Sequence, residues 1–338
     1  MPVAYLTTLY EYNTWANRRI TETAARLTED QRHETPFAIG AIHKTLVHML
    51  GAEWTWRQRV EYGVSPPTLL QEADLPTLDA LLARWGEEEA AWRAYLATLT
   101  AADLTRDVHY RTTGGRDWSN PLWLILAHLH NHGTQHRSEV AAMLTELAYS
   151  PGDLDLDDAH WSPATGDTTL PVMPAEFLRT LYDYNYWAHR RLLETAARVT
   201  DAQRRAPVFA IGSVHDTLAH TLGAEWLWRR RLSGEGSPVA LPDTVRSGDF
   251  EALRALWDEE EPAMRTFVAG LTAADLAADV DYRTLGGHEG RANRWLLLAH
   301  VLNHSTQHRS EVAAMLTELG ASPGDLDMIV YWRGRPGA

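Results

Sequence analysis

The sequence contains no cysteine among its 338 residues. This absence excludes disulfide bonds, thiolate metal ligands and a protein thiol as nucleophile, so any metal ion must be held by nitrogen or oxygen atoms. The chain also lacks an apolar run of the roughly 18 residues needed to span a bilayer. Its first residues have neither the basic nor the apolar segment of a signal peptide. We therefore expect a cytoplasmic protein with no membrane partner.

The charge balance argues against a nucleic-acid partner. The formal net charge is −14, with 31 Lys and Arg against 45 Asp and Glu, and the basic residues form no stripe of the kind that duplex-binding proteins show.

A Gly-x-Ser-x-Gly motif is missing as well, which leaves serine-nucleophile chemistry without support. Hydrophobic residues make up 45% of the chain, a normal share for a globular protein with a core.

The sequence is a tandem repeat with a constant offset of 172 residues. Residues 134–147 recur letter for letter at residues 306–319, and residues 50–54 recur at residues 222–226. A constant offset means that no net insertion separates these landmarks. It indicates duplication of a whole domain, because a solenoid would repeat over a much shorter period.

The domain boundaries follow from the end of the repeat. Residues 150–155 match residues 322–327. The stretch between Asp157 and Pro174 is rich in Asp, Thr, Pro and Gly, a composition typical of linkers. The sequence therefore predicts copy 1 at residues 1–156, a linker at residues 157–173 and copy 2 at residues 174–338.

Apolar spacing predicts four long helices in each copy. In copy 1 these helices are expected at residues 3–27, 41–62, 77–98 and 120–148. Residues 108–115, between the third and fourth helices, are predicted to form a short hairpin. Because the offset carries every element into copy 2, we predict an all-α protein built from two tandem four-helix bundles.

Histidines retained in both copies are the candidates for a shared site. Five pairs of histidines match at the offset of 172: His43/His215, His48/His220, His128/His300, His132/His304 and His136/His308. The unmatched histidines include His33, His109, His130, His160, His189 and His288. These cannot belong to a site that both copies share.

The spacing of the matched histidines predicts a metal site in each copy. His132 and His136 are four residues apart on the fourth helix, so their imidazoles share one face and can converge on a cation. His48 lies mid-way along the second helix among apolar residues and is expected to point into the bundle, where such sites are usually built. We predict one divalent metal ion per copy, held by His48, His132 and His136 in copy 1 and by His220, His304 and His308 in copy 2.

Two matched histidines stay outside this ligand set. His128 lies one turn before His132, and two roles remain open for it: orienting a ligand or packing in the core. His43 lies five residues before His48 and does not share its face, so we expect it to cap a helix or to pack.

These motifs resemble the DinB/YfiT-like superfamily of helical-bundle metalloproteins. The resemblance rests on residues 12–17, 46–54, 128–137 and 151–155, and it covers nearly all of both copies. It implies two tandem four-helix bundles of the DinB/YfiT-like type, and it carries the family's three metal-binding histidines onto the two sets named above. It further implies zinc or nickel as the metal ion. Many relatives are homodimers, so the resemblance implies an intramolecular pseudo-dimer of the two copies.

The expected chemistry is activation of a small molecule at the metal. Three histidine ligands leave one position of the metal ion open, where a water molecule or a thiol can be deprotonated. Some relatives in the superfamily transfer low-molecular-weight thiols. The leading hypothesis is therefore a metal-dependent transferase or isomerase that joins such a thiol to a small electrophilic substrate.

Two alternatives remain open from the sequence. The first is a metal-dependent hydrolase, with Glu139 and Glu311 as candidate general bases and with Glu53 and Glu225 in a poorer register. The second is a non-catalytic metal-binding protein of a stress response. The sequence assigns no catalytic residue.

Overall fold

The structure is a computed structural model that describes residues 3–156, 175–236, 248–285 and 287–335. Its contacts divide the chain into two compact units. Unit 1 comprises Met1–Leu154 together with Asp327–Ala338, and unit 2 comprises Asp155–Leu326. The predicted linker at residues 157–173 lies outside the described residues.

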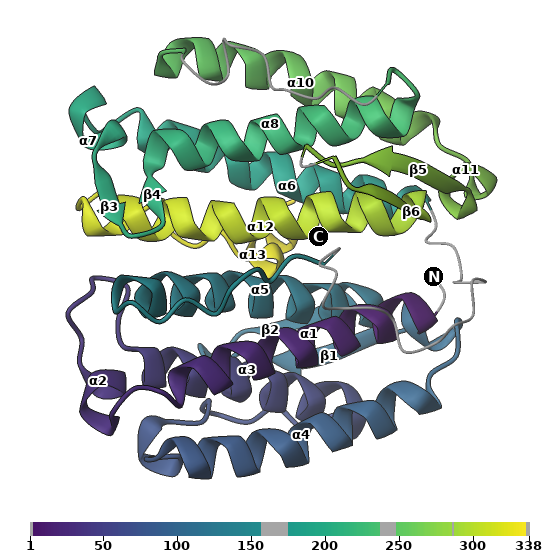
Figure 1. The fold of residues 1–338 in the computed structure, drawn as a ribbon. Coiled ribbons are helices and arrows are strands. Elements are labelled where there is room, and N and C mark those ends of the chain that lie inside the picture. The colour runs from purple at the N-terminus through teal and green to yellow at the C-terminus, as the bar shows by residue number, and fades with distance from the viewer. Residues whose placement is uncertain (1–2, 157–174, 237–247, 286, 336–338) are drawn as a thin grey trace. The chain divides into compact units, whose positions relative to one another are not determined.

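Unit 1 contains the four predicted long helices and the predicted hairpin (Figure 1). The long helices are α1 (Val3–Ala24), α3 (Ile42–Tyr62), α4 (Leu78–Thr98) and α5 (Leu122–Glu146). The shorter elements are α2 (Glu29–His33), the 3-10 turns η1 (Glu72–Asp74) and η2 (Asp103–Thr105), the antiparallel strands β1 (Asp107–Arg111) and β2 (Asp117–Pro121), and α13 (Met328–Arg333).

Local chemistry explains most of the helix ends. At the start of α4, the Thr77 side chain accepts a hydrogen bond from the Ala80 backbone N–H, as an N-cap residue does. At the end of α3, Gly63 adopts a left-handed conformation with φ of +68°, which glycine tolerates without strain. The helix predicted from residue 120 begins at Leu122, because residues 117–121 pair with β1 instead.

The short helix α2 was not predicted. The helix expected over residues 3–27 ends at Ala24, and the chain turns and starts again at Glu29. Thr28 and Gln31 form a reciprocal capping box at this new start. A Thr followed three residues later by Gln is a readable start signal, so the sequence did carry this information.

The four long helices of unit 1 enclose one core. Helix α5 packs against α1 and α3, and α4 packs against the same two helices. Leu46, Leu50, Trp85 and Met143 are among the fully buried side chains between them. This arrangement is a four-helix bundle, and it confirms the predicted fold class.

Unit 2 repeats the bundle. Its long helices are α6 (Ala175–Ala196), α8 (Val214–Ser233), α10 (Phe250–Gly270) and α12 (Arg294–Glu318). Its shorter elements are α7 (Asp201–Arg205), α11 (Ala273–Ala277) and the strand pairs β3–β4 (Pro207–Phe209, Gly212–Ser213) and β5–β6 (Asp279–Arg283, Glu289–Asn293). Helix α12 packs against α6 and α8, and so does α10.

The end of the chain packs with unit 1 although it follows copy 2 in the sequence. Helix α13 lies against α5, and the rings of Trp332 and Trp123 meet edge to face with centroids 5.7 Å apart. The contacts therefore group residues 327–338 with unit 1, whereas the sequence repeat assigns them to copy 2. Within the described residues, none of the helices combines the length and apolarity required to cross a bilayer.

Candidate metal centres

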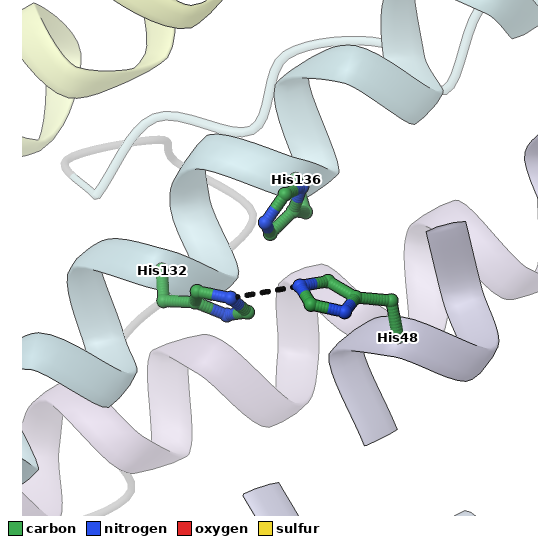
Figure 2. Close-up of side chains that lie close together, drawn as sticks. All are labelled: His48, His132 and His136. Atoms are coloured by element: carbon green, nitrogen blue, oxygen red, sulfur yellow. Dashed lines mark hydrogen bonds between the residues drawn. The ribbon is translucent and has the colours of Figure 1, made fainter. Parts of the chain in front are cut away.

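Three histidine rings of unit 1 converge between two helices. His48 comes from α3, and His132 and His136 come from successive turns of α5 (Figure 2). The Nε2 atoms of His48 and His132 are 3.1 Å apart. The ring centroid of His136 lies 4.7 Å from that of His48 and 4.4 Å from that of His132. One ligand nitrogen of each ring lies within 4.8 Å of the others, so the set can hold a metal ion.

A divalent cation fits this donor set. Two nitrogen ligands of a tetrahedral zinc ion, each bound at about 2.1 Å, are about 3.4 Å apart. The separation of the His48 and His132 nitrogens, 3.1 Å, is close to that value. Three imidazole nitrogens suit zinc, nickel, copper or iron. The donor set alone therefore defines the class of metal without choosing one.

Two histidines of this set, His48 and His132, favour the neutral form that binds metals. Burial lowers the pKa of His48 to about 4, and repulsion from His136 adds to the effect. Burial, again with a contribution from His136, brings the pKa of His132 well below its usual value. At neutral pH these imidazoles keep a lone pair for a cation, so metal binding does not first have to displace a proton from them.

A carboxylate orients the third ring. Glu139 lies one turn after His136 on α5, and its Oε2 is 2.7 Å from His136 Nδ1. Carboxylates commonly contact the second nitrogen of a metal-binding histidine in this way, which fixes the ring and makes its other nitrogen more basic. Glu139 is also the candidate general base from the sequence, and the structure places its carboxylate against the ring of His136.

Unit 2 reproduces the same geometry. His220 comes from α8, and His304 and His308 come from α12. The Nε2 atoms of His220 and His304 are 3.1 Å apart, and the His308 centroid lies 4.7 Å and 4.3 Å from those of the two other rings. Glu311 Oε2 contacts His308 Nδ1 at 2.6 Å. His220 is exposed whereas His48 is half-buried, so the second site is the more open.

The other candidate carboxylate of unit 1 belongs to the core. Glu53 is buried, and its carboxylate accepts hydrogen bonds from Trp85 Nε1 at 2.9 Å and from Asn13 Nδ2 at 3.0 Å. Arg137, also buried, donates to Asn13 Oδ1 and to Asn17 Oδ1. This network ties α1, α3, α4 and α5 together. Glu53 is therefore a member of the hydrogen-bond network of the core.

Unit 2 has a corresponding buried hydrogen-bond network around Glu225, in which some of the partner residues differ. Glu225 accepts hydrogen bonds from Tyr186 and, at 3.5 Å, from Asn185 Nδ2. Arg309 Nη1 donates to Asn185 Oδ1 at 2.7 Å. Burial raises the pKa of Glu225 to about 8, so this carboxyl group also belongs to the interior.

The structure places the two remaining matched histidines of copy 1. His43 is buried, and its Nε2 lies 2.7 Å from the backbone oxygen of Leu75, in agreement with a packing role. His128 lies next to His132, with ring centroids 5.6 Å apart, and its Nδ1 is 2.8 Å from Asp327 Oδ1. Sequence reasoning did not single out Asp327. Its only signal was that Asp155 stands at the matching position of copy 1.

The fold and the two sites define a class: tandem helical bundles that each present a histidine triad suited to a divalent metal ion. Residues 1–169 and 173–335 each match the DinB family, so the chain belongs to that family. A relative is Protein DinB of Bacillus subtilis (strain 168), which is 24% identical over 167 residues. That match covers 94% of the relative and 46% of this chain, so the relative corresponds to about one copy.

Proposed function

We propose that this protein is a metal-dependent enzyme in which each histidine triad holds one zinc or nickel ion and activates a low-molecular-weight thiol. The observation that carries the proposal is the convergence of three imidazoles in each unit. Bound by three such ligands, a divalent cation has a free position at which it lowers the pKa of a thiol or a water molecule.

The chain's own residues would bind the metal ion and orient its histidine ligands. Each triad joins one helix to two successive turns of another, which fixes the spacing of the ligands. Glu139 and Glu311 contact the Nδ1 atoms of His136 and His308 and so fix the orientation of these rings. Ligands fixed in this way would keep one position of a bound metal ion free for a substrate.

The residues around the triad favour a thiol over a water molecule as the nucleophile. The chain has no cysteine, so a sulfur nucleophile has to be supplied as a small molecule. Hydrolysis requires a general base beside the metal-bound water, and Glu139 is engaged by His136 at 2.7 Å. A thiol loses its proton more easily than water does, so it depends less on such a base.

The test is thiol consumption by protein reconstituted with zinc or with nickel. The assay offers low-molecular-weight thiols with a panel of small electrophiles. Conjugation forms a sulfur–carbon bond, and the thiol proton is either taken up by the electrophile when its double bond or ring opens or released together with the displaced leaving group. We expect metal-dependent loss of free thiol. The control is the His132→Ala, His304→Ala variant, which lacks one predicted ligand in each triad and whose folding is checked by circular dichroism.

The same assay separates the alternatives. Metal-loaded protein that consumes no more thiol than the control variant would overturn the proposal. Ester or amide hydrolysis without added thiol would favour a metal-dependent hydrolase. Metal binding with neither activity would favour a non-catalytic metal-binding protein, such as one acting in a stress response.

A further inference from the structure

A close contact between a histidine and a carboxylate lies beside the triad of unit 1. His128 Nδ1 is 2.8 Å from Asp327 Oδ1, and the two side chains are 3% and 16% exposed. His128 comes from α5, one turn before His132, whereas Asp327 directly precedes α13 near the end of the chain. Both residues belong to unit 1. The chain end that follows copy 2 thus supplies an acidic group next to the histidines of copy 1.

The charge of Asp327 reaches the triad. Asp327 contacts the ring of His128, whose centroid lies 5.6 Å from that of the predicted ligand His132. Burial acts to raise the pKa of Asp327, but the contact with His128 outweighs burial and brings this pKa below its usual value. Asp327 therefore stays ionised at neutral pH and presents a negative charge to the triad.

A metal ion in this triad would need such a charge. Three neutral histidines leave the two positive charges of a divalent cation uncompensated, and placing a charge in a partly buried site is costly without an opposite charge nearby. We propose that Asp327 is a positioning residue of the metal centre of unit 1, where it fixes His128 against His132 and offsets the charge of the cation. This inference rests on metal binding by the triad, as in the proposed function.

Other contacts hold α13 in place without this carboxylate. Arg333 Nη2 donates to the Tyr110 hydroxyl at 2.8 Å, and Trp332 packs against Trp123. Asp327 is the N-cap residue of α13 but makes no capping hydrogen bond through its side chain. Asn is an equally good N-cap residue, so Asp327→Asn is expected to remove the charge while α13 remains docked.

The repeat supplies a matched control. Asp155 and His300 occupy the positions equivalent to Asp327 and His128, and Asp155 is grouped with unit 2. We therefore expect Asp155→Asn to act on the centre of unit 2 and to leave the centre of unit 1 unchanged. A second control is Asp325→Asn, which removes the same charge from an exposed position two residues away.

The experiment is a zinc titration of the full chain carrying His304→Ala, so that only the triad of unit 1 is intact. Asp327→Asn in this background should weaken zinc binding by about 10- to 100-fold, the usual effect of removing a group that supports a metal ligand. His128→Ala should have a similar effect, and the double variant should be no weaker than the weaker single variant, because the two residues act as a pair. The variants Asp155→Asn and Asp325→Asn should bind zinc as the parent does.

The inference is overturned if folded Asp327→Asn protein binds zinc as tightly as its parent. It is also overturned if this variant loses thermal stability in the metal-free state while its zinc affinity is unchanged, since Asp327 would then only anchor α13. If the His304→Ala parent itself binds no zinc, the triad assignment fails together with the inference. Asp327→Ser keeps an N-cap residue and replaces the asparagine variant if the latter does not fold.

Discussion

Gly133 leaves room for the side chain of Asn13 at the crossing of α5 and α1. A Cβ atom at residue 133 would lie inside van der Waals distance of Asn13 Oδ1 and 2.8 Å from Arg137 Nη1. Both neighbours are buried and bound to one another. The glycine directly follows His132, so this close approach also sets the position of a predicted metal ligand.

Replacing Gly133 by alanine is expected to destabilise unit 1. The added methyl group must displace Asn13 or Arg137 from the core network, and overpacking of this kind costs about 1–3 kcal/mol. Urea denaturation of metal-free protein measures the change. The matched control is Gly86→Ala on α4, where a Cβ meets nothing within 4 Å, and where the better helix propensity of alanine should stabilise by about 0.5–1 kcal/mol. Equal effects of the two substitutions would contradict this reading.

Removing the carboxylate behind His136 is expected to weaken metal binding in unit 1. Glu139→Ala in the His304→Ala background should lower zinc affinity by about 10- to 100-fold, because the ring loses the partner that orients it. Glu139→Gln, which keeps an acceptor oxygen, should cost less. Isothermal titration with zinc provides the affinities.

The control for this substitution is Glu146→Ala, an exposed position on the same helix. It removes the same charge without touching the triad, so zinc affinity should not change. A Glu139→Ala variant that binds zinc as well as Glu146→Ala does would show that the contact with His136 has no part in holding the ion.

Ionisation of Glu53 is expected to destabilise the protein as pH rises. Burial raises the pKa of Glu53 from 4.5 to about 7, against the opposing hydrogen bonds from Trp85 and Asn13. Between these two pH values the folded protein keeps a proton that the unfolded chain has released, so the free energy of unfolding falls with rising pH. The full effect is on the order of 3 kcal/mol, since each pKa unit corresponds to about 1.4 kcal/mol.

Glu53→Gln should remove this contribution, because the amide does not ionise. Denaturation of metal-free protein at several pH values from 4.5 to 8 gives the slope for the parent and for the variant. The exposed Glu87→Gln provides a control that should keep the parent's slope. A slope that is unchanged in Glu53→Gln would show that Glu53 does not carry the pH dependence.

The sequence predicted the parts of the molecule that repeat with a fixed period. Helical spacing of apolar residues located the four long helices of each copy, and the retained spacing of His132 and His136 placed two rings on one face. The third ring, His48, could be chosen because its helix has a well-defined inner face. These features depend on short-range geometry, which the order of residues encodes directly.

Contacts between distant segments were not predictable in this way. The partner of His128 is Asp327, which lies at the other end of the chain and is grouped with unit 1 only after folding. Glu53 has its partner Trp85 on another helix, so its place in the core could not be read from its distance to His48. In both cases the tertiary packing of helices decides the contact, and no local pattern reports it.

The central claim is that each triad holds one metal ion, and metal stoichiometry tests it most directly. Elemental analysis of zinc- or nickel-reconstituted protein should give two ions per chain, about half as much for His132→Ala, and almost none for His132→Ala combined with His304→Ala. Unchanged metal content in the folded double variant would contradict the account, because each triad would then have lost a ligand without losing its ion.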